Sequence, residues 1–127
     1  MPPPADLVRL RHMLDRAAEA VEMVKGQCRQ DLDADRQLNL SLVRLLEIVG
    51  EAAARVSEAT QRQCPDIPWP AVVGLRNRLI HGCDSVDFDI LWNIPADDLP
   101  PLTAALTAFL APPEPPKDTS PSASGGT

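Results

Sequence analysis

The residues best suited to chemistry lie in one short stretch, Arg76-Asn77-Arg78-Leu79-Ile80-His81-Gly82. An arginine carries a permanent charge on a planar fork that matches a phosphate group. A histidine titrates near neutral pH and can move a proton to or from a ribose hydroxyl. Cleavage of RNA by attack of the 2′-OH on the adjacent phosphate needs these two functions and no metal ion. Arg76 and His81 therefore suit a metal-independent RNA-cutting site without a cofactor.

The spacing of the pair limits how the two side chains can act together. On a continuous helix, five residues turn the chain by about 500°, which leaves Arg76 and His81 about 140° apart. Asn77 and His81, four residues apart, would share a face. Arg76 and His81 can meet one phosphate only if the helix distorts near its end, or if two copies of the motif face each other.

An Arg-x4-His spacing also arises by chance, so a second interpretation stays open. Arg76 and Arg78 could be solvated charges, with His81 interacting with the carbonyl dipole at the end of a helix. Glu51 could hold Arg76 in place, or it could serve the structure or an interface.

Three aspartates follow the stretch: Asp84, Asp87 and Asp89. They could form a magnesium site, but we expect them to cap the next helix and to pair with Arg76 or Arg78. The three cysteines, one of them Cys83, are far apart and without a C-x-x-C pair, which favours reduced thiols over a disulfide or zinc site.

The elements that must position these residues are helices. Leu, Ala and Val supply the apolar residues, and their spacing of three and four predicts an all-α, up-and-down bundle of four or five helices. Prolines and polar runs set the boundaries. The expected helices span about 5–24, 36–59, 70–82 and 88–94, with Asp87 as the cap of the fourth, and a last one follows Pro100–Pro101.

The chain of 127 residues is expected to form one domain, residues 1–111, followed by a disordered Pro/Ser/Gly-rich tail, residues 112–127. The net charge of −6 argues against a broad basic surface for nucleic acid, although it leaves room for a local site. No signal peptide or membrane-spanning run is evident, so we expect a cytoplasmic protein without membrane contacts.

Five separate stretches give the motif a context. In order and spacing they closely resemble the HepT family of HEPN proteins over roughly residues 5–110. The stretches are Ile48–Ala53, Pro65–Trp69, Gly74–Gly82, Val86–Trp92 and Asp98–Pro100.

The resemblance implies a helical homodimer whose Arg-x4-His motifs line a cleft between the two protomers. It implies a ribonuclease toxin, paired with an MntA-type nucleotidyltransferase antitoxin in a type VII toxin–antitoxin system. By position, Arg76 would stabilise the scissile phosphate, His81 would be the general acid or base, and Asn77 would orient one of them. Arg78 is a further candidate for binding RNA.

One position departs from the family pattern, which continues His-x-Tyr and uses that tyrosine as the site where the antitoxin attaches AMP. Here the position is Cys83, and the chain contains no tyrosine. Tyrosine adenylylation is therefore impossible, and Cys83 marks the regulatory position without its phenol. Two alternatives to a nuclease follow: a non-catalytic HEPN subunit that binds a nucleotidyltransferase or a nucleotide, and a helical dimerisation module.

Overall fold

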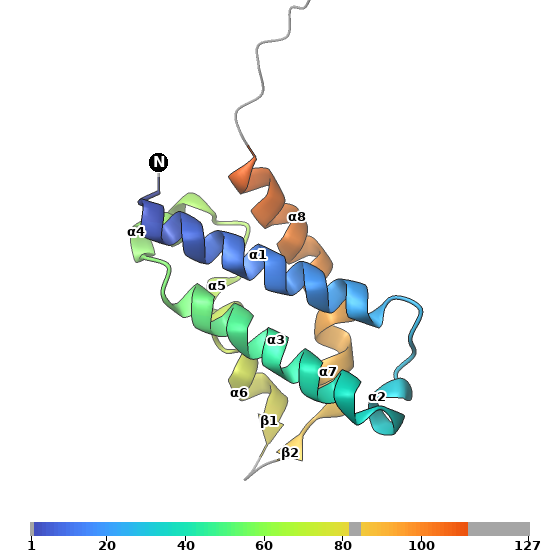
Figure 1. Ribbon diagram of the computed structural model, residues 1–127. Helices are drawn as coiled ribbons and strands as arrows, with labels where there is room; N and C mark the ends of the chain where they lie inside the picture. The colour runs from blue at the N-terminus through green and yellow to red at the C-terminus, as the bar shows by residue number, and fades with distance from the viewer. Residues whose placement is uncertain (1, 82–84, 112–127) are drawn as a thin grey trace, which may run out of the picture.

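The computed structural model of the chain describes residues 2–81 and 85–111, and nearly all of the elements in this part are helical. This confirms the all-α class (Figure 1). In chain order the elements are α1 (Pro4–Val24), α2 (Asp31–Ala34), α3 (Arg36–Ala54), α4 (Glu58–Gln63), α5 (Trp69–Val73), α6 (Leu75–Leu79), β1 (Ile80–His81), β2 (Ser85–Val86), α7 (Phe88–Asn93), the π-helical turn η1 (Ile94–Asp98) and α8 (Leu99–Leu110). The predicted tail, residues 112–127, lies outside the described residues, and none of the described helices is long and apolar enough to cross a bilayer.

The core lies between the long helices. α1 and α3 lie side by side and run in opposite directions, and α8 packs on α1 (Figure 1). Each helix buries an apolar stripe with helical spacing, which supplies most of the stabilisation. The buried members of these three stripes are Leu10, Met13, Ala17, Ala20 and Val24 on α1, Leu38, Leu42, Leu45, Leu46, Val49, Ala52 and Ala53 on α3, and Leu99, Leu102 and Leu106 on α8.

The predicted second helix is wrong at its end, because α3 stops at Ala54 and α4 begins at Glu58. Ser57 is the N-cap of α4, and its hydroxyl accepts a hydrogen bond from the Thr60 backbone N–H. The buried carboxylate of Asp6 on α1 fixes this corner. It accepts hydrogen bonds from the Ser57 N–H (3.2 Å), the Ser57 hydroxyl (2.6 Å) and the Thr60 hydroxyl (2.6 Å).

The predicted helix over residues 70–82 is also divided. The chain forms α5, bends at Gly74 and continues as α6, which ends at Leu79. Ile80 is already extended, and β1 pairs with β2 in antiparallel register, Ile80 opposite Val86. The Leu79 carbonyl accepts a hydrogen bond from the N–H of Asp87, eight residues later (2.9 Å), which an isolated helix would not have.

The segment after β2 follows its sequence signals closely. As predicted, Asp87 caps α7: its side chain accepts hydrogen bonds from the backbone N–H groups of Asp89 (2.9 Å) and Ile90 (3.1 Å). Pro95 does interrupt the helix, since it lacks the N–H that an α-helical turn requires, and the chain forms η1 there before α8 begins.

Candidate active site

The predicted polar residues project from α6, which is only five residues long. Leu75 and Leu79, four residues apart, are both buried and attach the helix to the core. Arg76, Asn77 and Arg78 lie between these two anchors, and all three are exposed. The local fold therefore presents the polar part of the motif to solvent.

Arg76 turns toward α3. Its Nε lies 3.4 Å from Oε2 of Glu47, while the side chain as a whole remains 63% exposed. Glu47 is only 20% exposed, and its other oxygen, Oε1, lies 3.4 Å from Nη1 of Arg44. One carboxylate is thus shared by two arginines.

Glu47 was not singled out by the sequence, which instead suggested Glu51 as the partner of Arg76. Of the two roles left open for Glu51, holding Arg76 is not the one observed: Glu51 pairs with Arg44 at 3.9 Å, and Glu47 pairs with Arg76. A signal was available, because Gly50 marks the place where another helix approaches α3. The residue one turn earlier on that face is Glu47.

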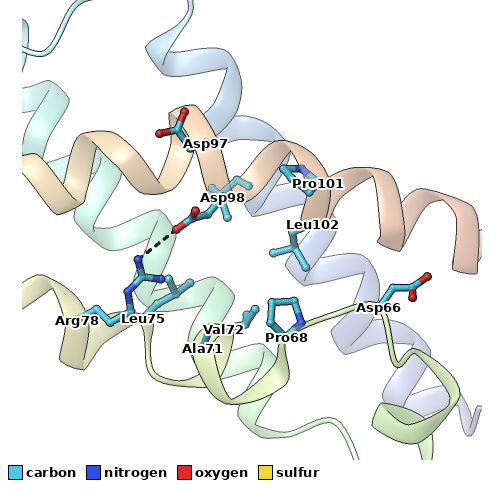
Figure 2. Close-up of a pocket in the computed structure, with 11 residues that line it drawn as sticks. Asp66, Pro68, Ala71, Val72, Leu75, Arg78, Asp97, Asp98, Pro101 and Leu102 are labelled. Atoms are coloured by element: carbon cyan, nitrogen blue, oxygen red, sulfur yellow. Dashed lines mark hydrogen bonds and ion pairs between the residues drawn. The ribbon is translucent and has the colours of Figure 1, made fainter.

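Arg78 points in a different direction from Arg76. Two residues apart on a helix, their side chains diverge by about 200°. Arg78 reaches η1, where its Nη2 donates a hydrogen bond to Oδ2 of Asp98 at 3.2 Å (Figure 2). The structure therefore does not bring the two arginines to one point within a protomer.

His81 lies beyond the end of α6, in β1, where its Cα is opposite that of Ser85. The expectation of a helix running through His81 is therefore wrong, and the angles derived from it do not apply. The end of α6 at Leu79 removes the constraint that a continuous helix would place on Arg76 and His81 within one chain. Cys83 lies outside the described residues.

Asp89, one of the aspartates that follow the motif, has another partner than the predicted Arg76 or Arg78. Asp89 accepts a hydrogen bond from Nε of Arg29 at 2.7 Å, and this bond raises the pKa of the Arg29 guanidinium. Asp87 caps α7, and Asp84 lies outside the described residues. The predicted cap at Asp87 is thus confirmed, whereas Asp89 pairs with Arg29 and not with Arg76 or Arg78. Among residues 2–81 and 85–111, His, Cys, Asp and Glu side chains form no group of three or more that could hold a metal ion.

A groove of about 510 Å³ lies beside α6, between α5–α6 on one side and η1–α8 on the other (Figure 2). Its lining includes the apolar side chains of Val72, Leu75 and Leu102, together with Asp66, Asp97, Asp98 and Arg78. Arg78 and Asp98 bridge one end of the groove, and Asp66 lies at the other. Three carboxylates against one paired arginine would repel a phosphate backbone, so this groove does not suit an RNA strand.

Trp69 anchors the connector that leads to α5. It is buried, and its Nε1–H donates to the carbonyl oxygens of Gln61 and Cys64, both at 3.1 Å. Burial raises the pKa of the Cys64 thiol. Cys64 and the exposed Cys28 are free thiols, as expected.

Comparison with known proteins gives this geometry a family context. The family model described as "Ribonuclease HepT-like" matches residues 13–109. The chain is 33% identical over 93 residues to the "Probable ribonuclease HepT" of Thermococcus cleftensis, covering 70% of this chain and 84% of that one. It is 32% identical over 91 residues to a candidate RNase of Methanocaldococcus jannaschii (72% and 84% covered), and 32% identical over 101 residues to one of Caldanaerobacter subterraneus subsp. tengcongensis (80% and 90% covered). No solved structure matches the chain with significant similarity.

Proposed function

The chain belongs to the HepT-like family of ribonucleases, and we propose that it cuts RNA without a metal ion, with Arg76 and His81 as the essential pair. The observation that carries this proposal is the placement of Arg76. It is an exposed arginine, paired with a carboxylate whose side chain is only 20% exposed, near the start of the short helix that precedes His81. The relatives named as ribonucleases support the reaction class.

The proposed reaction is an internal transesterification. The 2′-oxygen of one nucleotide bonds to the adjacent phosphorus, and the bond from phosphorus to the 5′-oxygen of the next nucleotide breaks. The 2′-OH loses its proton to a general base, and the leaving 5′-oxygen gains one from a general acid. The products carry a 2′,3′-cyclic phosphate and a 5′-OH.

The residues of the motif divide these tasks. Arg76 stabilises the negative charge that develops on the phosphate oxygens, since its two terminal amino groups remain available while Glu47 contacts Nε. His81 acts as the general acid or base, and Asn77 orients one of the pair. Arg78 is the candidate for binding RNA. To contact a phosphate, it must give up its hydrogen bond to Asp98 or bind the phosphate and Asp98 at the same time.

We propose that the active form is a homodimer, in which motifs from two protomers line one cleft. Two exposed apolar side chains near Arg76 support an interface there, because a dimer would cover them. They are Leu40 on α3, which is 52% exposed, and Val73 on α5, which is 40% exposed. Leu40 precedes Arg44 by one turn, and Val73 lies three residues before Arg76. A dimer built over these residues would bring two copies of the motif close together.

The biological role that we propose is that of a cytoplasmic toxin neutralised by an MntA-type nucleotidyltransferase antitoxin. Because Cys83 stands where the family carries the modified tyrosine, adenylylation of a tyrosine cannot silence this chain. Neutralisation by binding, or by modification at another residue, must replace it.

The test is cleavage of an RNA oligonucleotide by purified protein in EDTA. Parent protein should produce 2′,3′-cyclic phosphate ends, and Arg76→Ala and His81→Ala should each lower the rate by at least about a hundredfold. Two matched controls remove the same side chains elsewhere: Arg62→Ala on α4, where Arg62 pairs only with Glu58 among the described residues, and His12→Ala on the exposed face of α1. Parental rates in both motif variants would refute the assignment.

The groove beside α6 favours one alternative function, a non-catalytic subunit that binds a nucleotidyltransferase. An apolar lining with an acidic rim suits a protein segment carrying Lys or Arg beside apolar side chains, and it disfavours the phosphates of a nucleotide. Stable binding to a transferase that Asp66→Lys abolishes, combined with no RNA cleavage by the free dimer, would select this alternative. Loss of the transferase in Asp66→Lys with cleavage intact would instead place the antitoxin in the groove of an active nuclease.

A further inference from the structure

We propose that Glu47 is a positioning residue for the reaction, which orients the guanidinium of Arg76 toward the scissile phosphate. This inference rests on the proposed function and extends it to a residue of α3, outside the motif. It starts from the shared carboxylate described above, in which Oε2 faces Arg76 and Oε1 faces Arg44, each at 3.4 Å.

The contact to Arg76 leaves the reactive part of that side chain free. A guanidinium has five N–H donors, one on Nε and four on the two terminal nitrogens. Glu47 contacts Nε, so the four terminal donors stay available for the paired oxygens of a phosphate. A carboxylate beside Nε therefore attracts the guanidinium without occupying the face that would bind the substrate.

Glu47 itself is well fixed. Its side chain is 20% exposed, whereas those of Arg76 and Arg44 are each 63% exposed. The second arginine neutralises the other oxygen, so the carboxylate is held from both sides. A long, exposed side chain such as Arg76 gains orientation from a fixed partner of this kind.

The backbone keeps Glu47 and Arg76 within reach. Gly50 lies one turn after Glu47, and a Cβ at this position would lie 3.2 Å from the Val72 carbonyl oxygen and 3.8 Å from Cβ of Leu75. This close approach of α5 to α3 sets the distance between α3 and α6 where Arg76 begins to project. The packing of the helices, and not the attraction between the two charges, therefore brings Glu47 and Arg76 together.

A role in stability alone does not account for this arrangement. Ion pairs between exposed side chains contribute little to folding, and Arg76 is mostly exposed. The value of the contact lies in the direction that it gives the guanidinium. A structural role and a positioning role therefore predict different measurements.

The experiment compares Glu47→Gln with Glu51→Gln, using full-length protein and a fluorogenic RNA oligonucleotide in EDTA. Glu51 is a matched control on the same helix, since it contacts Arg44 but, among the described residues, not Arg76. We expect Glu47→Gln to lower kcat by about tenfold to a hundredfold with KM within about twofold, and Glu51→Gln to retain the parental kcat. Both variants should keep the parental unfolding midpoint, and Glu47→Asp should fall between parent and Glu47→Gln.

A double-mutant cycle separates this inference from the proposed function. If Glu47 acts through Arg76, then Glu47→Gln should cause no further loss in an Arg76→Ala background. An equal loss in both backgrounds, or a parental kcat in Glu47→Gln, would overturn the positioning role and leave the proposed function standing. If the parent cuts no RNA, or if Arg76→Ala cuts like the parent, the proposed function fails and this inference fails with it.

Discussion

Replacement of Gly50 by alanine tests whether the close approach of α3 and α5 is fixed. Glycine inside a helix costs about 1 kcal/mol relative to alanine, so propensity alone predicts that Gly50→Ala stabilises α3 by about that amount. Against this gain stands the new Cβ, which would lie 3.2 Å from the Val72 carbonyl oxygen and 3.5 Å from that of Val73. Relief of the tighter contact requires the α5 backbone to move by a few tenths of an ångström.

Movement of α5 is opposed by its own anchors. Trp69 is buried and bonded to two carbonyl groups at the start of the helix, and Leu75 is buried immediately after its end. Overpacking of a fixed site costs about 1–3 kcal/mol, which exceeds the gain in propensity. We therefore expect Gly50→Ala to lower the free energy of unfolding by about 1 kcal/mol, and to lower the rate of RNA cleavage because α6 moves with α5.

The assay is urea unfolding, followed by circular dichroism for helix content and by Trp fluorescence. Protein concentration is held constant because the stability of a dimer depends on it. Ser41→Ala, at an exposed position of α3, is the matched control and should stabilise by no more than about 0.7 kcal/mol. A gain of about 1 kcal/mol for Gly50→Ala, with an unchanged m-value and full activity, would show that α5 yields freely and that the packing argument is wrong.

Three further predictions concern stability. Hydrogen bonds from Ser57 and Thr60 lower the pKa of Asp6. The carboxylate therefore contributes to the free energy of unfolding above the ordinary aspartate pKa of about 3.9, and this contribution is lost as pH falls through the lower pKa of the folded state. Asp6→Asn should make the acid limb of a stability-versus-pH curve shallower, and an unchanged limb would contradict this. Gly26 has φ of +76° and open space where a Cβ would project, so Gly26→Ala should destabilise by about 1–2 kcal/mol through backbone strain alone, with Gly26→Asn losing less in thermal melts. Trp69→Phe should cost about 1 kcal/mol in urea unfolding because the carbonyl groups of Gln61 and Cys64 lose the indole N–H and keep only their backbone donors, and a cost near zero would mean that water replaces the indole.

Local signals made much of the fold predictable. The apolar spacing located the long helices, and the cap at Asp87 was correct because an aspartate bonds to N–H groups two and three residues ahead. The interruption at Pro95 followed from its missing N–H. Each of these features depends on residues close together in the chain.

The errors arose where contacts beyond a single helical turn determine the end of a helix. α3 and α4 separate at a corner held by Asp6, which is 51 residues from Ser57. α6 ends at Leu79 where β1 pairs with β2 and the Asp87 N–H takes the Leu79 carbonyl. No local propensity signals either contact.

The candidate site divides in the same way. The motif residues Arg76, Asn77 and Arg78 were found from their types and spacing, and their exposure agrees with a role at the surface. The ion-pair partners of the two arginines were not predicted from the sequence. Arg76 pairs with Glu47, and Arg78 pairs with Asp98. Partner choice depends on the helix packing angle and on close approach at Gly50, which the sequence only hints at.

The carboxylate of Asp6 has a consequence for where translation can begin. Met13 is an internal methionine, and the match to the family begins at that residue. A chain initiated there would keep the whole matched region, yet it would lack the acceptor for Ser57 and for the hydroxyl of Thr60, a side chain that is fully buried. Such a product would leave a buried hydroxyl without its partner at the corner between α3 and α4. A chain that starts at Met13 would therefore have the complete motif and a weakened scaffold, so the residues before Met13 belong to the fold although the family match does not include them.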